Sequence, residues 1–282
     1  MPGLPDEVGQ LTLAAIPMVK GLDADSGRAT IPVGTDRQEG AHTGVADPFV
    51  AAHSPTPWSA RRINRVAQAT GARTYLEIGV EQGSTFRAVT VPERTGVDPR
   101  FGFESELEAD AHTRFEQVTS DRFFSTLSPE ATFDFYYIDG LHTFEQTYRD
   151  VCNAILHSHH RTVLLVDDTQ PSDVFSSLRE QDRALRHRAE SGGRSLAWHG
   201  DTFKVIFAVH DFYPGLDYRT IVGSGNGQTL IWRSNLGWRA PFYDSLEAIS
   251  RLDYFDALDQ LDIMRCTSED DAIELCVSAL RG

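Results

Sequence analysis

The feature that most constrains the fold of this chain is a repeated alternation of short apolar runs with longer amphipathic stretches. Strands buried on both faces of a sheet read as near-continuous apolar runs, and parallel strands need a crossover between them, usually a helix. Such runs lie at residues 74–80, 95–98, 116–120, 133–139 and 162–168, and a stretch with helical periodicity follows each. We therefore predict a parallel sheet that is covered by helices on both faces.

Two later apolar runs are expected to complete the sheet on one side. Residues 203–212 and 228–233 have the composition of strands. No crossover helix is recognised between them, so we predict that they pair antiparallel at one edge. The predicted fold class is α/β, with a doubly wound, mostly parallel seven-stranded sheet. Further helices are predicted at residues 104–115, 172–190, roughly 243–262 and 269–280.

The composition and the periodicity of the sequence change near residue 56 and again near residue 235. Residues 1–55 are rich in Gly, Pro, Asp and Thr, and we predict an irregular N-terminal lead-in. Residues 56–235 contain the strand–helix alternation and form the predicted α/β domain. Residues 236–282 are predicted to be a C-terminal helical extension.

The composition excludes several classes of partner. The formal net charge is −15, whereas a nucleic-acid-binding surface needs Lys and Arg. We find neither an apolar run long enough for a membrane span nor a secretory signal. The three scattered cysteines fit thiols in a reducing compartment. We expect a cytoplasmic protein that acts on a small molecule, with no nucleic-acid or membrane partner, and a homo-oligomer remains open.

Polar and small residues gather at the ends of the first three predicted strands. Ligands of parallel sheets bind outside the carboxyl ends of the strands, and glycines there let the backbone approach a ligand. An acid about twenty residues after such a turn is placed to bind a ribose diol, although Asp98 alone is also explained as a helix N-cap. The predicted cofactor-binding residues are Glu77, Gly79, Gly83, Ser84, Thr85, Asp98, Ser120 and Asp121. Together they indicate a ligand that contains adenosine.

Two short motifs resemble those of a known family. The turn at residues 77–83 reads E-x-G-x-x-x-G, and residues 96–99 read GVDP. These resemble the first two motifs of the class I S-adenosylmethionine-dependent methyltransferases, and the resemblance spans about residues 57–233. It implies a Rossmann-like methyltransferase fold in which Gly79 and Thr85 hold the methionine end and Asp98 the ribose. In this family Ser120 and Asp121 would meet the adenine, and Glu77 would shape the pocket floor.

The next two strands end in carboxylates. Asp139 ends one strand, and Asp167 with Asp168 ends the following one. Neighbouring strand ends bring the three side chains into one crevice, where their mutual repulsion favours a bound cation. Oxygen ligands suit Mg²⁺, with Mn²⁺ or Ca²⁺ as alternatives. The competing interpretation is that Asp167 and Asp168 only cap the next helix.

This acidic set, with the imidazole that follows it, resembles a narrower group of enzymes. Asp139-Gly140-Leu141-His142 is similar to the Asp-x-x-His of the magnesium-dependent sugar O-methyltransferases of macrolide and aminocoumarin biosynthesis, and the acidic triad also resembles that of catechol O-methyltransferase, which has Lys in place of His142. The resemblance implies that Asp139, Asp167 and Asp168 bind the metal and that His142 is a general base.

The predicted function is therefore S-adenosylmethionine-dependent, divalent-metal-assisted O-methylation of a hydroxyl of a small molecule, a sugar or glycoside. Two alternatives stay open at this point. One is a cephalosporin hydroxylase-like enzyme, whose fold and acidic set are similar. The other is a nucleoside-binding protein without catalytic activity.

Overall fold

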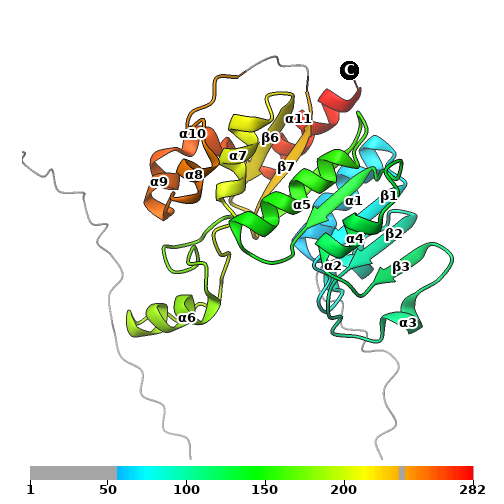
Figure 1. The fold of residues 1–282 in the computed structure, drawn as a ribbon, viewed down its shortest axis with the longest axis horizontal. Coiled ribbons are helices and arrows are strands. Elements are labelled where there is room, and N and C mark those ends of the chain that lie inside the picture. Colours follow the sequence, from blue (N-terminus) through cyan, green and yellow to red (C-terminus); the bar gives the residue numbers. More distant parts are fainter. Residues whose placement is uncertain (1–55, 235–238, 282) are drawn as a thin grey trace, which may run out of the picture. The chain divides into compact units, whose positions relative to one another are not determined.

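The computed structural model describes residues 56–234 and 239–281, so the lead-in predicted for residues 1–55 lies outside the described residues. The strands are β1 (Thr74–Ile78), β2 (Glu93–Val97), β3 (Thr113–Glu116), β4 (Phe135–Ile138), β5 (Val163–Gln170), β6 (Leu216–Ile221), β7 (Gly227–Arg233) and β8 (Cys266–Thr267). They form one sheet in the order β3-β2-β1-β4-β5-β7-β6-β8 (Figure 1). Only β7 runs antiparallel to its neighbours. The predicted α/β fold class is therefore confirmed, with β8 added at the edge.

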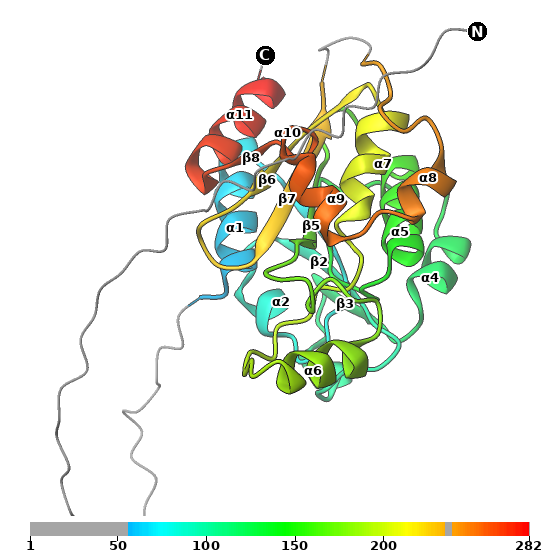
Figure 2. The same ribbon diagram turned by 90° about the vertical axis from the view of Figure 1, so that its left-hand side faces the viewer.

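Helices cover both faces of this sheet (Figure 2). They are α1 (Trp58–Thr70), α2 (Ser84–Ala88), α3 (Ser105–Glu108), α4 (Ser120–Thr126), α5 (Phe144–Leu156), α6 (Gln181–Glu190), α7 (Lys204–Phe212), α8 (Leu246–Ser250), α9 (Tyr254–Asp259), α10 (Leu261–Met264) and α11 (Glu269–Arg281). α1, α2 and α11 share one apolar core, and α4, α5 and α7 share the other. None of these helices is long and apolar enough to cross a lipid bilayer.

Alternate residues of the central strands supply the two cores. Leu76 and Ile78 of β1 belong to the core under α5 and α7, whereas Tyr75 belongs to the core under α1 and α11. β4 and β5 divide their side chains in the same way. Because both faces are covered, the strands are apolar throughout, which is why the sequence shows continuous runs instead of an apolar–polar alternation.

The strand predicted at residues 203–212 is wrong, because this segment forms the helix α7. Lys204 to Val209 are all buried, and the unbroken apolar run from Val205 to Val209 fits a buried strand as well as a buried helix. The antiparallel partner of β7 is instead β6, a strand that the sequence reading missed. The connection from β5 to β6 passes through α7, and a loop containing several glycines then joins β6 to β7.

Three other element boundaries also differ from the prediction. The strand expected at residues 116–120 lies earlier, at β3, so only the short α3 remains of the helix expected at residues 104–115. The helix expected from residue 172 begins at Gln181, because Asp173 accepts the backbone N–H of Ser176 and forms a turn that competes with a helix. The helix expected at roughly 243–262 divides into α8, α9 and α10.

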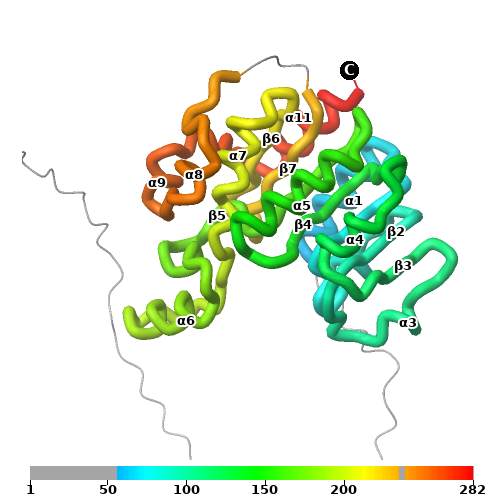
Figure 3. Tube along the Cα trace, viewed as in Figure 1, coloured from blue at the N-terminus to red at the C-terminus, as the bar shows by residue number. Residues whose placement is uncertain are grey.

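The segment between β5 and α7 extends from the sheet as an arm that carries α6 (Figure 3). The buried guanidinium of Arg188 holds this arm together. It donates to both carboxylate oxygens of Asp173 and to the backbone carbonyls of Ser195 and Ala197. These bonds fix the end of the arm just before Trp198, which reaches the candidate site described below.

An ion-pair cluster joins α11 to α1. The carboxylate of Glu269, which is 7% exposed, accepts hydrogen bonds from Arg61, Arg62 and Arg65. Arg62 is fully buried and also donates to the Gln228 side chain of β7. Burial raises the pKa of the Glu269 carboxyl, but the hydrogen bonds from Arg61 and Arg62 outweigh it and lower that pKa to about 2.

Glu269→Gln is expected to lower the free energy of unfolding at pH 7 by about 2–3 kcal/mol, because it leaves the buried Arg62 cation without its counter-ion. The pKa of Glu269 is lower in the folded state than the unfolded value of about 4.3. Its contribution is therefore full above that value and is lost as the pH falls towards 2. Urea unfolding between pH 3 and 8 should show the variant approaching the wild type only in acid. Glu274→Gln, at an exposed position of α11, is the control and should match the wild type throughout. A constant difference across this range would contradict the assignment.

Candidate active site

A cavity of about 710 Å³ lies at the carboxyl ends of β1, β2 and β4. This volume is within the range of small-molecule sites in proteins. Of the predicted cofactor residues, it is lined by Glu77, Gly79, Ser84, Thr85, Asp98, Ser120 and Asp121. Gly83 does not line the cavity and instead precedes the first residue of α2 with a left-handed φ of 73°.

At one position of the turn after β1, only glycine fits the backbone conformation and the available space. Gly79 has φ +85°, and a Cβ built there would lie 1.9 Å from the carbonyl oxygen of Asp139 on the neighbouring strand. Asp98 holds the turn from the other side, because its Oδ2 accepts the N–H groups of Val80 and Glu81, both at 2.9 Å. The predicted ribose-binding acid is thus also the residue that ties the turn to β2.

The far end of the cavity is organised by Gln146 of α5, a residue that the sequence reading missed. Its Nε2 lies 3.2 Å from Ser120 Oγ and 3.3 Å from Asp121 Oδ1, the two residues predicted to meet an adenine. It also donates to Asp150, one turn further along α5. Gln146 reads in the sequence as an ordinary residue of an amphipathic helix, so only the tertiary contact reveals its place.

The carboxylates predicted at the ends of β4 and β5 do converge. Ile138 pairs with Val166 in the parallel register, which places Asp139 beside Asp167 and Asp168. One ligand atom each from Asp139, His142 and Asp168 lies within 4.8 Å of the others. Asp167 lies next to this group, but its oxygens accept hydrogen bonds from Tyr137, from Asn226 and from the N–H of Asp168. We call Asp139, His142 and Asp168 the acid cluster.

A bulge in β5 allows both consecutive aspartates to face the site. Successive side chains of a regular strand point to opposite faces of the sheet. The pairing of β5 with β7 shifts register between Val166 and Gln170, and Asp168 has φ +57°. Bulges re-aim side chains in this way, and a non-glycine residue in the left-handed region stores strain that the surroundings must offset. Asn226 contributes here, because its Nδ2 donates to Oδ1 of both aspartates.

His142 lies between the two carboxylates of the acid cluster. Its Nε2 is 3.4 Å from Asp139 Oδ1 and its Nδ1 is 3.0 Å from Asp168 Oδ2, while its ring stacks on Trp198 at 4.8 Å between centroids. The buried Nδ1 is not aligned for a hydrogen bond with any described residue. Burial lowers the pKa of His142, but Asp139 and Asp168 outweigh it and raise that pKa to about 10. Burial and the charge of Asp167 raise the pKa of Asp139 to about 8. The His142 imidazolium is thus the positive charge that faces these two carboxylates.

A directed chain of hydrogen bonds reaches the acid cluster from the opposite side. A guanidinium only donates, so Arg62 fixes the Gln228 side chain with its oxygen toward Arg62 and its Nε2 toward Ser59. Carboxylates only accept, so the one proton of the Tyr137 hydroxyl is shared between Asp167 and Asp139. The Ser59 hydroxyl, 3.0 Å from Tyr137, must then donate to the Tyr137 oxygen. The chain orients the Tyr137 proton toward the acids.

Comparison with known families gives this arrangement a context. Residues 58–169 match the family model described as a methyltransferase domain. The chain carries a class I methyltransferase domain. The family and the enzyme class predicted from the motifs at residues 77–83 and 96–99 are therefore confirmed. A search of the curated proteins found no match to the chain.

Several solved structures are similar to this chain at low identity. An O-methyltransferase from Bacillus cereus in complex with SAH is 15% identical, with 64% of this chain and 82% of that chain covered and a TM-score of 0.43. The O-methyltransferase of tomaymycin synthesis from Streptomyces achromogenes, in complex with SAM, is 16% identical, with 62% and 78% covered and a TM-score of 0.42. With TM-scores below 0.5, neither informs the acceptor of this methyltransferase.

Four residues around the acid cluster were missed by sequence reasoning. Tyr137 reads as an apolar strand residue, and Trp198 and His199 lie in a segment without recognisable periodicity. The sequence gives a weak indication that Asn226 is a site residue, because Asn226 precedes a strand that runs antiparallel to β5. Its position at the start of β7 therefore falls at the carboxyl edge of the parallel strands. A polar residue at that point is a candidate site residue once the antiparallel direction is known.

Asp98→Asn is expected to weaken the binding of S-adenosylhomocysteine by at least about tenfold. Both carboxylate oxygens of Asp98 accept backbone N–H groups, Oδ2 from Val80 and Glu81 and Oδ1 from Arg100. An amide nitrogen would therefore face an N–H group in either orientation, so the backbone of the β1–α2 turn or of the segment after β2 would move. Isothermal titration calorimetry measures the affinity directly. Asp110→Asn is the matched control, since Asp110 is an exposed loop acid that also accepts a backbone N–H, from His112. Equal affinity of the Asp98 variant and the wild type would contradict the role of Asp98.

Proposed function

We propose that this methyltransferase transfers the methyl group of S-adenosylmethionine to a hydroxyl of a small molecule, with a divalent cation held at the acid cluster. One observation carries the proposal. Asp139 and His142 line the same cavity as Glu77, Gly79 and Asp98, so the predicted cofactor residues and two of the three residues of the acid cluster open onto one space. A methyl donor in that cavity would lie beside the groups that can prepare an acceptor oxygen.

The residues around β1 suit the binding of the donor. S-adenosylmethionine supplies a methyl group on a sulfonium, which a hydroxyl oxygen displaces in line. Glu77 is 1% exposed and accepts a hydrogen bond of 2.6 Å from the Tyr75 hydroxyl. Burial raises the pKa of Glu77 well above its usual range, which favours the neutral acid at the cavity floor. Ser84, Thr85 and Asp98 provide polar groups along the wall.

The acid cluster suits a divalent cation in its donor atoms and in its charge. Asp139 and Asp168 offer carboxylate oxygens, which Mg²⁺ and Mn²⁺ prefer. A cation bound there would orient an acceptor and lower the pKa of a coordinated hydroxyl. The vicinal hydroxyls of a sugar or of a catechol both fit this chemistry, because two neighbouring oxygens can bind one cation at the same time.

His142 is the residue proposed to accept the proton of the acceptor hydroxyl. Its ring is held in one plane by the stacking contact with Trp198, which the Arg188 bonds of the arm keep in place. A cation between Asp139 and Asp168 would engage the carboxylate oxygens that otherwise face the imidazole. Asp167 supports the cluster from behind through Tyr137 and Asn226. Each side chain thus has a role that its contacts allow.

Removal of divalent cations is expected to abolish turnover. Purified protein should release S-adenosylhomocysteine from S-adenosylmethionine with at least one member of a panel of catechols and glycosides, lose this activity in EDTA, and regain it with Mg²⁺ or Mn²⁺. Mass spectrometry of the product would show one added methyl group on oxygen. Turnover that persists in EDTA after dialysis against a chelating resin would contradict the role of the cation.

The three aspartates are expected to differ in their effect on cation binding. Electron paramagnetic resonance of Mn²⁺ measures this without any acceptor. Asp139→Asn and Asp168→Asn should weaken binding by about 100-fold or more, because each removes the charge of a ligand. Asp167→Asn should weaken it by about tenfold or less, the lower range for a residue that orients ligands. An Asp167 variant that loses as much affinity as the Asp168 variant would instead make Asp167 a direct ligand.

A further inference from the structure

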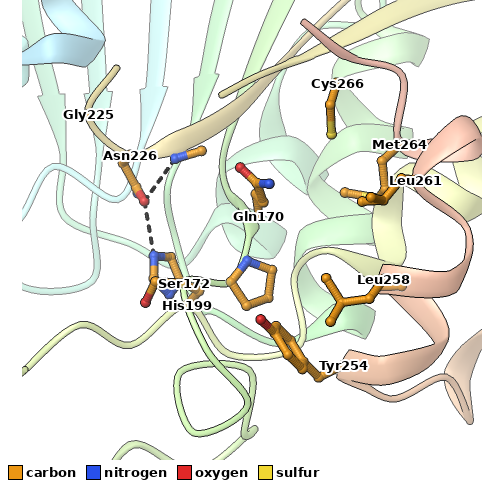
Figure 4. Close-up of a pocket in the computed structure, with 13 residues that line it drawn as sticks. Gln170, Ser172, His199, Gly225, Asn226, Tyr254, Leu258, Leu261, Met264 and Cys266 are labelled. Carbon is orange, nitrogen blue, oxygen red and sulfur yellow. Dashed lines mark hydrogen bonds between the residues drawn. The ribbon is translucent and has the colours of Figure 1, made fainter. Parts of the chain in front are cut away.

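Two side-chain amides at the carboxyl edge of the sheet have their nitrogen bound to acids. One is Asn226, whose Nδ2 donates to the two consecutive aspartates of β5. Its oxygen is also in use, because it lies 3.0 Å from His199 Nε2 (Figure 4) and accepts the N–H of Gly227. The other amide is Gln146 of α5, which lines the cofactor cavity. Its oxygen has a different environment.

The surroundings of Gln146 determine which end of its amide meets the acids. Its Nε2 lies 3.2 Å from Ser120 Oγ, 3.3 Å from Asp121 Oδ1 and 3.1 Å from Asp150 Oδ1. Asp121 forms an ion pair of 2.9 Å with Arg149, so its carboxylate accepts and does not donate. The Ser120 hydroxyl can accept as well as donate and fits the same orientation. The amide nitrogen therefore points to these oxygens, and Oε1 points away from them.

The oxygen of Gln146 is thus an acceptor without a partner among the described residues. All hydrogen bonds of this side chain within the described part of the chain are made by Nε2. Oε1 keeps accessible surface, unlike the unpaired Nδ1 atoms of His142 and His199, which are buried. Because Gln146 lines the cofactor cavity, this oxygen is available to a molecule that binds there.

The order of the strands places Gln146 at the end of the cavity that is remote from β5. Its partner Ser120 follows β3, the edge strand, whereas the acid cluster lies at β4 and β5. Asp98, at the tip of β2, lies between these two ends. A methyl donor with its sulfonium near the acid cluster and its ribose at Asp98 therefore has its adenine beside Ser120 and Gln146.

We propose that Gln146 recognises the base of the methyl donor, because its Oε1 accepts a hydrogen bond from the 6-amino group of adenine. This inference rests on the donor binding of the proposed function and makes Gln146 a specificity-determining residue. The oxygen at C6 of hypoxanthine or guanine only accepts, so these bases would bring two acceptors together. The carboxylates behind Gln146 keep the amide from turning its nitrogen to such a base. The site thus selects adenine among the purines.

The experiment compares S-adenosylhomocysteine with S-inosylhomocysteine, which carries an oxygen at C6 and a proton on N1. Binding to the EDTA-treated protein is measured by calorimetry at neutral pH without an acceptor. The wild type should bind S-adenosylhomocysteine at least about tenfold more tightly, since the inosine oxygen leaves Oε1 of Gln146 unpaired. Gln146→Met keeps the length of the side chain but has no amide, and it should lower this ratio of affinities at least about fivefold.

Gln181→Met is the matched control, because Gln181 lines the same cavity but belongs to the arm, at the first position of α6. It should leave the ratio of affinities unchanged. If Gln146 only supported the structure of the site, its loss would weaken both ligands equally. An unchanged ratio in the Gln146 variant would therefore overturn this inference. Equal binding of the two ligands to the wild type would also overturn it, and this measurement needs no variant.

The outcomes also separate this inference from the proposed function. If neither ligand binds the wild type, the donor site and the role of Gln146 are both overturned. If the ratio of affinities behaves as expected and no S-adenosylhomocysteine forms from S-adenosylmethionine with any member of the acceptor panel, the role of Gln146 stands and the methyl-transfer proposal fails.

Discussion

The repulsion among three carboxylates at two neighbouring strand ends is the constraint around which this site is arranged. Two unit charges 4 Å apart near a protein surface interact by about 4 kcal/mol, and a hydrogen bond to a charged group returns about 1.5–3 kcal/mol. One such bond cannot offset one such repulsion. Asp167 receives several donors at once, which are the Tyr137 hydroxyl, the Asn226 amide and the N–H of Asp168. The other two acids lie within ion-pair distance of the His142 ring.

This arrangement explains which parts of the protein could be predicted from the sequence. The tips of β4 and β5 could be located because apolar runs stop abruptly at Asp139 and Asp167, and parallel neighbours bring such tips together. The different roles of Asp167 and Asp168 could not be predicted, because they depend on a bulge in the pairing of β5 with β7. Likewise, α7 was read as a strand because its short apolar run from Val205 to Val209 fits a buried strand as well as a buried helix.

The residues that complete the site come from segments whose local sequence carries little signal. Trp198 reaches His142 only because Arg188 closes the arm onto Asp173, and Asn226 reaches the acids only because β7 runs antiparallel. In the same way, the segment after residue 245 forms three short helices, although its sequence was expected to form one continuous helix. Such tertiary contacts lie beyond any reading of periodicity. They are also the parts most free to vary without altering the sheet.

The chain from Arg62 through Gln228 and Ser59 to Tyr137 has a consequence for proton traffic. A chain of groups can carry a proton away only if each of its hydrogen bonds can reverse direction. The last group must also be able to accept the proton. Arg62 has no lone pair, so every hydrogen bond of this chain keeps its direction. The chain therefore cannot carry a proton from the acid cluster into the protein interior. A proton released at the acid cluster would therefore leave on the side of the cavity that Asp139 and His142 line.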